Sequence, residues 1–196
     1  MSVRARKGKS GANPIGRRTL PVPKPQTKAP ELAIETLSNG TWRLSEQQPD
    51  AFTMVVFYRG LHCPVCTQYI SELDDKLEEF SERGVTVLAV SGDSEDRARQ
   101  AKEDWGLEQV TVGYGLAPDA MREWGLFISQ GITDEEPELF NEPGLFLIQP
   151  DSTIFLEALN SMPFGRPKLD DIRDGIDFVD EKGLTGAGRG LVAGRV

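Results

Sequence analysis

The sequence predicts an α/β fold, a layered sandwich with a central mixed sheet between helices and a β-hairpin at the N-terminal end. Two short apolar runs, 52–58 and 85–92, have the length and the β-branched and aromatic content of buried strands. A helical pattern follows each run, over 67–84 and 93–106. This alternation of strand and helix is typical of parallel central strands covered by helices.

The first elements are read from local signals. The segments "ELAIETL" and "TWRLSE", separated by the turn signal "SNG", predict a hairpin over 31–45. The helix over 67–84 has apolar residues at helical spacing and ends at Gly84. The helix over 93–106 begins with a capping residue and acidic residues, which suit the positive end of the helix dipole.

The second half closes the sheet. A short strand at 109–115 and a short helix at 117–126 are followed by a long connection of mixed character, 126–143. The segment "GLFLIQPDSTIFLEAL" predicts two strands around the turn "PDST". The final helix, 168–183, carries its apolar residues on one stripe: Leu169, Ile172, Ile176 and Val179.

Composition indicates the domain limits, the cellular location and the partners that the protein lacks. We expect a disordered basic arm rich in Pro and Gly over 1–29, one domain over 30–183 and a flexible Gly-rich tail over 184–196. The chain carries a net charge of −9, although residues 1–28 hold eight basic and no acidic residues, so the body is acidic and a poor nucleic-acid surface. It shows no membrane-length apolar run and no apolar signal region, so we expect a cytoplasmic protein that binds no membrane.

The segment "RGLHCPVCTQY", residues 59–69, contains both cysteines of the chain and its only histidine. One C-x-x-C pair does not make a disulfide framework, and in a reducing compartment it indicates redox or metal chemistry. A structural zinc site needs four ligands and this chain offers three Cys and His residues, so a zinc half-site and two ordinary buried cysteines are the weaker alternatives. We expect a redox dithiol without a metal or other cofactor.

Several segments in the same order carry a family resemblance. "KAPELAIETLSNGTWRLSE", "FTMVVFYRGLHCPVCTQYISEL", "VTVLAVSGDSEDRARQAKEDWGL", "GLFLIQPDSTI" and "GRPKLDDIRDGI" resemble the peroxiredoxin-like (AhpC/TSA) branch of the thioredoxin superfamily, over roughly 28–180. The resemblance implies a thioredoxin-like sandwich and a thiol-dependent oxidoreductase that reduces peroxides, with an external thiol as reductant. It also leaves a homodimer open, because relatives often dimerise.

The chain departs from the peroxiredoxin pattern at the site. On the signature P-x-x-x-T-x-x-C, Cys66 takes the attacking position, Cys63 the threonine position and Arg59 the proline position, and the family's arginine falls at Pro143. The pair Cys-Pro-x-Cys instead resembles thioredoxin, which implies that Pro143 is a cis-proline beside it. A protein disulfide reductase therefore stays open, as does a non-catalytic binding module of this fold, with or without a metal.

The remaining site roles follow from position. At the start of a helix, unpaired N–H groups and the helix dipole favour the thiolate form of a cysteine. We therefore expect Cys63 to attack the substrate and the more buried Cys66 to resolve the intermediate. The opposite order is the alternative. Pro64 suits the first helical turn. The supporting residues are Tyr58, through packing or its hydroxyl, Arg59, through its charge, and His62, which titrates near neutrality. Arg166 is expected to be structural or at an interface.

Overall fold

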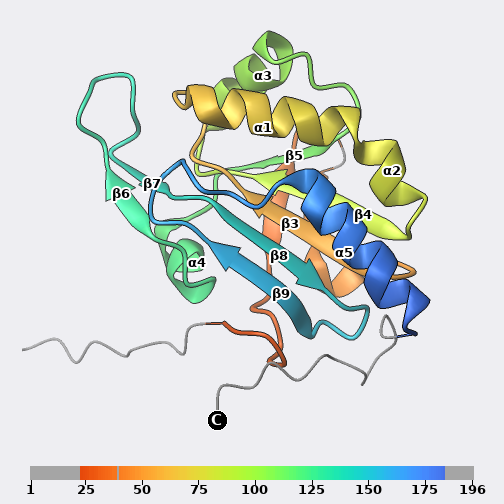
Figure 1. The fold of residues 1–196 in the computed structure, drawn as a ribbon. Coiled ribbons are helices and arrows are strands. Elements are labelled where there is room, and N and C mark those ends of the chain that lie inside the picture. The colour runs from red at the N-terminus through yellow and green to blue at the C-terminus, as the bar shows by residue number, and fades with distance from the viewer. Residues whose placement is uncertain (1–22, 39, 184–196) are drawn as a thin grey trace, which may run out of the picture.

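The computed structural model describes residues 23–38 and 40–183 (Figure 1). Within them, seven strands form one sheet in the order β2-β1-β5-β4-β3-β8-β9, and β6 and β7 form a separate hairpin. The strands are β1 Ala33–Thr36, β2 Gly40–Arg43, β3 Phe52–Phe57, β4 Val85–Val90, β5 Thr111–Tyr114, β6 Ile128–Gln130, β7 Leu139–Asn141, β8 Gly144–Ile148 and β9 Ile154–Leu159. The helices are α1 Pro64–Asp75, α2 Leu77–Ser81, α3 Glu95–Asp104, α4 Pro118–Glu123 and α5 Leu169–Glu181, with a 3-10 turn at Leu44–Glu46.

The mixed sheet confirms the predicted fold class. Strands β3, β4 and β5 are parallel, and β8, β9, β1 and β2 extend the sheet with antiparallel neighbours. All six residues of β3 are buried, because both faces of the central strand are covered. Met54 and Val56 face α1, α2, α3 and α5, whereas Val55 and Phe57 face α4, as the two-residue period of a strand requires.

The predicted helix 67–84 is two helices that begin earlier and break at Lys76. The break falls where the chain is tied to two neighbours. The buried Asp74 carboxylate accepts three backbone N–H groups, from Glu108, Gln109 and Val110, while Lys76 forms an ion pair with Asp170 on α5 at 2.7 Å. These tertiary contacts outweigh the continuous helical pattern of the sequence.

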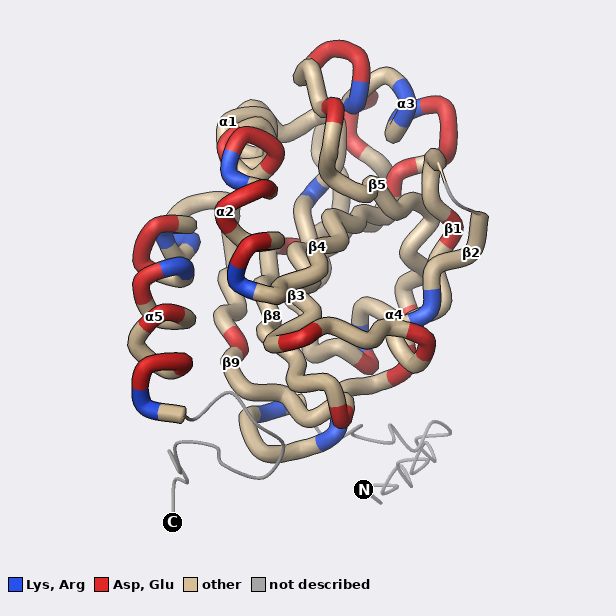
Figure 2. The backbone as a smooth tube through the Cα atoms, turned by 90° about the vertical axis from the view of Figure 1, so that its right-hand side faces the viewer, with Lys and Arg blue, Asp and Glu red and all other residues tan. Residues whose placement is uncertain are grey.

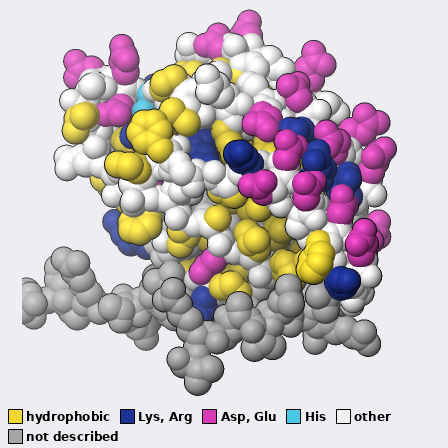
Figure 3. Space-filling model, in the orientation of Figure 1, with side chains coloured by type: hydrophobic (Ala, Val, Ile, Leu, Met, Phe, Trp, Pro, Cys, Tyr) yellow, Lys and Arg dark blue, Asp and Glu magenta, His cyan; other side chains and the backbone are white. Residues whose placement is uncertain are grey.

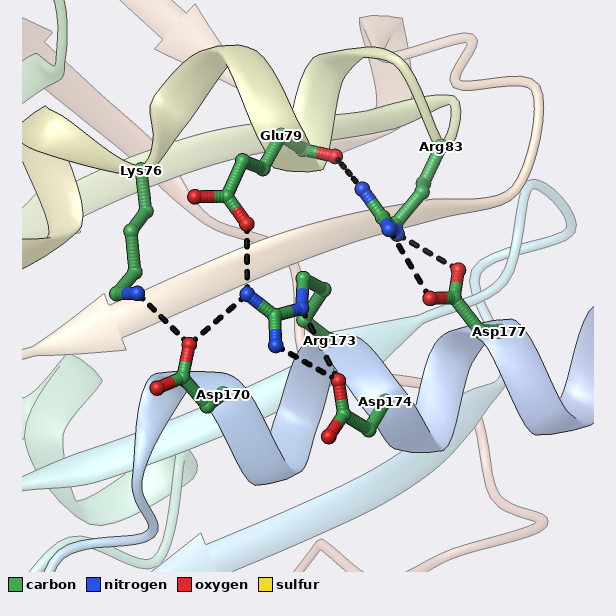
Figure 4. A network of polar contacts seen from close by, with 7 residues as sticks. All are labelled: Lys76, Glu79, Arg83, Asp170, Arg173, Asp174 and Asp177. Atoms are coloured by element: carbon green, nitrogen blue, oxygen red, sulfur yellow. Dashed lines mark hydrogen bonds and ion pairs between the residues drawn. The ribbon is translucent and has the colours of Figure 1, made fainter.

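Ion pairs fix α5 against α2 (Figure 4). Arg173 donates to Glu79 at 2.7 Å, and Arg83 donates to both oxygens of Asp177, at 2.6 and 3.0 Å. Figure 2 shows acidic residues interspersed with basic ones on the two helices, so opposite charges can pair across them. The loop that leads from β9 into α5 is therefore held at its helical end.

Two segments differ from the sequence prediction. The connection 126–143 contains the hairpin β6–β7, whose apolar pattern is weak because it is half exposed, with Ile132 90% exposed. Residues 23–29, placed in the disordered arm by the prediction, contact the sheet: the N–H of Gln26 donates to Ile154 at 2.9 Å and that of Ala29 to Ser152 at 2.9 Å. The rest of the predicted arm, 1–22, and the predicted tail, 184–196, lie outside the described residues.

No helix in the described ranges combines the length and the apolar character that a membrane span requires.

Candidate active site

The two cysteines lie where β3 ends and α1 begins, as the sequence predicts. Cys63 is the N-cap of α1 and Pro64 occupies its first turn, where the missing N–H of proline costs nothing. The backbone N–H of Cys66 donates to the Cys63 sulfur at 3.3 Å, and both thiols are free. Both residues pack into the core under α1, at 1% and 0% exposure, so the expected difference in exposure between Cys63 and Cys66 is small.

The pair has strongly different acidities. A hydrogen bond from the Cys66 thiol, together with the Cys66 backbone N–H, Arg59 and the charge of Arg166, lowers the pKa of Cys63 to about 6 against the opposing effect of burial. Burial, followed by the neighbouring Cys63 sulfur, raises the pKa of Cys66 well above its ordinary value. Near neutral pH, Cys63 is therefore a thiolate and Cys66 a thiol that donates to it.

Arg59 lies beside the pair, as predicted, and its side chain is held by residues on and next to β7. Its Nε is 3.3 Å from the buried carboxylate of Glu142, and its guanidinium stacks over the Phe140 ring at 4.6 Å. The other oxygen of Glu142 accepts from Ser129 at 2.6 Å. The hairpin β6–β7, which the sequence prediction left unassigned, thus fixes the cation that assists Cys63.

His62 is half-buried, and its ring lies 4.7 Å from that of Phe140. Burial, followed by the positive charge of Arg59, lowers the pKa of His62, so the ring is neutral near pH 7. His62 therefore packs against Phe140 and brings no positive charge to Cys63.

The loop before the pair is held by a buried acid that the sequence prediction missed. The Asp93 carboxylate, after β4, accepts the N–H of Leu61 at 2.7 Å and pairs with Arg97 at 2.9 Å. Gly60 passes this carboxylate with φ +125°, where an added Cβ would lie 2.7 Å from an Asp93 oxygen. A left-handed glycine in close contact is thus required for the loop to reach Cys63.

Tyr58 is buried at the end of β3, with its ring 5.8 Å from Trp105 in an edge-on arrangement. Its carbonyl accepts from the buried Asn141 amide at 3.0 Å. Burial raises the pKa of the Tyr58 hydroxyl, so the group stays neutral. Of the two roles that the sequence left open, packing is the one with the most contacts.

Arg166 occupies the site, which overturns its assignment as a structural or interface residue. Its Nη2 donates to the Cys66 sulfur at 3.0 Å, and its guanidinium lies 5.1 Å from the centre of the Tyr69 ring. The Tyr69 hydroxyl donates to the carbonyl of Pro167 at 2.9 Å, which fixes the same loop. The contact joins residues 100 positions apart, so no local sequence pattern indicates it.

Pro143 lies near the pair, but the prediction of a cis bond is wrong, since the described residues contain no cis peptide bond. The chain runs extended from β7 into β8. The N–H of Glu142 donates to Phe127 at 2.7 Å, and the Pro143 carbonyl accepts from Asn160 at 2.9 Å. Pro143 and Arg166 line one small cavity, so a cation from another loop reaches the region where the family arginine was expected.

Among the residues that the structure describes, no group of three or more His, Cys, Asp and Glu side chains is arranged to hold an ion.

A thioredoxin-like sandwich with a dithiol at the start of its first long helix places the protein in the thioredoxin superfamily. Within that class the chain belongs to the AhpC/TSA family, whose sequence model matches residues 25–156.

Related proteins and structures agree with this membership. The chain is 28% identical over 143 residues to a 1-Cys peroxiredoxin of Medicago truncatula, a match that covers 70% of this chain and 64% of that protein. It is 27% identical over 146 residues to a chloroplastic 2-cysteine peroxiredoxin of Chattonella marina var. antiqua, covering 71% of this chain and 72% of that protein.

Solved structures show the same fold at low identity. The peroxiredoxin-like protein from Aquifex aeolicus aligns with a TM-score of 0.67 at 19% identity, over 82% of this chain and 90% of that one. AhpC of Mycobacterium bovis aligns with a TM-score of 0.66 at 17% identity, over 86% and 98%.

Proposed function

We propose that this chain is a thiol-dependent peroxidase that cycles Cys63 and Cys66 between a dithiol and a disulfide. The observation that carries the proposal is the pairing of a Cys63 of pKa about 6 with a protonated Cys66 one helical turn away. A thiolate is the nucleophile in peroxide reduction, and the adjacent thiol is placed to resolve the product. Membership in the AhpC/TSA family supports the same chemistry.

The steps follow from these positions. The Cys63 thiolate attacks one peroxide oxygen, so an S–O bond forms, the O–O bond breaks and the other oxygen leaves as an alcohol or water after taking a proton. Cys66, deprotonated beside Arg166, then attacks the Cys63 sulfenic acid, forming the disulfide and releasing water. Arg59 lies where it can donate to the peroxide in place of the absent threonine and arginine of the family pattern.

The burial of the sulfurs favours a peroxide over a protein disulfide as the oxidant. Both cysteines are at most 1% exposed, so a small molecule can approach Cys63 where a folded protein's disulfide needs the surrounding loops to open. The Cys-Pro-x-Cys sequence still favours disulfide exchange as the second candidate. In either case an external thiol must return the two electrons.

Intact mass after treatment with hydrogen peroxide tests the proposal. The wild-type protein should lose about 2 Da as the disulfide forms, and Cys66→Ser should gain about 16 Da as the sulfenic acid. Cys63→Ser should react at least tenfold more slowly, an estimate of about 1.4 kcal/mol in the barrier. If Cys63→Ser gains oxygen as fast as Cys66→Ser, Cys66 is the attacker; if the wild-type mass is unchanged, the protein is no peroxidase.

Two further expectations accompany this proposal. A cytoplasmic location stays a prediction and is tested by fractionating the source cells. A homodimer likewise stays a prediction, tested by light scattering of the purified protein in its reduced and oxidised states.

A further inference from the structure

A groove of about 460 Å³ lies beside the cysteine pair, between the first turns of α1 and the loop from β9 to α5. Its lining includes Val65, the residue between Pro64 and Cys66, and also Tyr69, Phe164 and Arg166. Phe164 is 64% exposed, and on this face of the molecule basic side chains lie between hydrophobic ones (Figure 3). The groove has the volume of a small-molecule site, and its walls combine apolar residues with polar and charged ones.

Two charges of opposite sign lie on the groove lining. Lys168 precedes α5 and Glu72 lies on α1, both are exposed, and neither has an ion-pair partner among the residues that the structure describes. Of the two other charged residues on the lining, Asp170 is already engaged by Lys76 and Arg173, and Arg166 contacts Cys66. The groove therefore offers cations and an unpaired anion to a ligand that carries both signs.

One residue of the groove lining contacts the redox pair. Arg166 lines the groove and at the same time donates to the Cys66 sulfur at 3.0 Å. In the disulfide the Cys66 sulfur is uncharged, so the guanidinium is available to an incoming anion. A thiolate in the groove thus meets the cation that contacts the Cys66 sulfur.

Building on the peroxidase function proposed above, we propose that this groove binds the reductant, a low-molecular-weight peptide thiol that carries carboxylate and ammonium groups. Lys168 and Arg166 would pair with its carboxylate and thiolate, and Glu72 with its ammonium group. Val65 and Phe164 would cover its apolar body. The volume suits a molecule of two or three residues and is small for a protein partner.

The chemistry assigns each sulfur a role. The bound thiolate attacks the sulfur of Cys66, so a mixed disulfide forms and the bond to Cys63 breaks. Cys63 leaves as the thiolate, which its low pKa favours. A second thiol attacks the sulfur of the bound peptide, giving the peptide disulfide and returning Cys66, which takes up a proton. Two thiols thus supply the two electrons.

The test uses the full chain with its disulfide already formed by a diazene oxidant, so that reduction is measured apart from peroxide reduction. Glutathione is the zwitterionic probe and 2-mercaptoethanol the uncharged one, and the free thiols are counted over time. Lys168→Glu should slow reduction by glutathione about tenfold, since it replaces an attraction with a repulsion, and leave reduction by 2-mercaptoethanol unchanged. Lys102→Glu, at a groove on the far side of α3, is the matched control and should change neither rate.

Two results would overturn the proposal. One is an equal loss of glutathione reactivity in the two lysine variants; the other is a wild-type rate with glutathione no higher than with 2-mercaptoethanol. Titration of the oxidised protein with S-methylglutathione, which cannot reduce it, should show saturable binding that Lys168→Glu weakens, and absence of binding also counts against the groove. A failure to form the disulfide with peroxide would overturn only the proposed peroxidase activity, because the reduction assay does not use peroxide.

Discussion

Replacing Cys66 tests how the protein makes Cys63 acidic. The side-chain hydrogen bond from Cys66 is the largest contribution to the low pKa of Cys63, ahead of the Cys66 backbone N–H and Arg59. Cys66→Ala removes the side-chain donor and keeps the backbone. Cys66→Ser keeps a hydroxyl donor at the same position and is the matched control.

The size of the effect follows from the charge on the acceptor. A hydrogen bond to a charged group contributes about 1.5–3 kcal/mol, and one pKa unit corresponds to about 1.36 kcal/mol. The alanine variant should therefore have a Cys63 pKa between about 7 and 8, compared with about 6 in the native site. The serine variant should stay near the native value.

The assay is the rate of alkylation by iodoacetamide as a function of pH, followed by intact mass. Each variant contains one cysteine, so the midpoint of the rate profile is the pKa of Cys63. Equal midpoints near 6 in the two variants would show that the thiol donor contributes nothing, and the helix N-terminus and Arg59 would then carry the effect.

Three further changes test the frame around the site. Gly60→Ala places a Cβ 2.7 Å from an Asp93 oxygen at φ +125°, and it should lower the free energy of unfolding, measured in urea, by about 2 kcal/mol or more. The control is Gly175→Ala on α5, where the added Cβ meets open space, and it should raise the free energy of unfolding by about 0.5 kcal/mol. Equal effects of the two substitutions would refute the clash at Gly60. Asp74→Ala leaves three backbone N–H groups without their acceptor and should cost about 3 kcal/mol, whereas a loss under about 1 kcal/mol would show that water replaces the carboxylate. The free energy of unfolding of the reduced protein should rise as the pH increases from about 6 towards about 8.5, because in this range only the unfolded chain still holds the Cys63 proton. The gain is lost as the pH falls through the folded pKa of Cys63. A Cys63→Ser variant that keeps the same rise would contradict this prediction.

Most of the fold could be predicted from local sequence signals. The run 52–58 is buried on both faces and gives β3, and the stripe from Leu169 to Val179 gives α5. The hairpin β6–β7 gave no clear signal, because a strand pair that packs only partly on the body has no strict apolar alternation.

The residues of the site likewise divide into those that local sequence signals indicate and those that only the folded structure brings in. The cysteine pair, Arg59 and the helix start lie together in the sequence, so their positions could be inferred from one segment. Arg166 contacts Cys66, and Asp93 contacts the loop before the pair. Both come from distant loops, and each looks in the sequence like an ordinary surface charge. Sequence resemblance placed the family arginine at Pro143, while the structure brings in a different arginine through folding of the β9–α5 loop.

The contact of residues 23–29 with β9 has a practical consequence for shortened versions of the protein. β9 is the outermost strand on its side of the sheet, and the pairing of Lys28 with Thr153 covers the beginning of its free edge. A truncated version that starts at residue 30, the domain limit expected from composition, would uncover these backbone groups. An uncovered edge strand pairs readily with another molecule, so such a fragment should aggregate where one beginning at residue 23 stays dispersed.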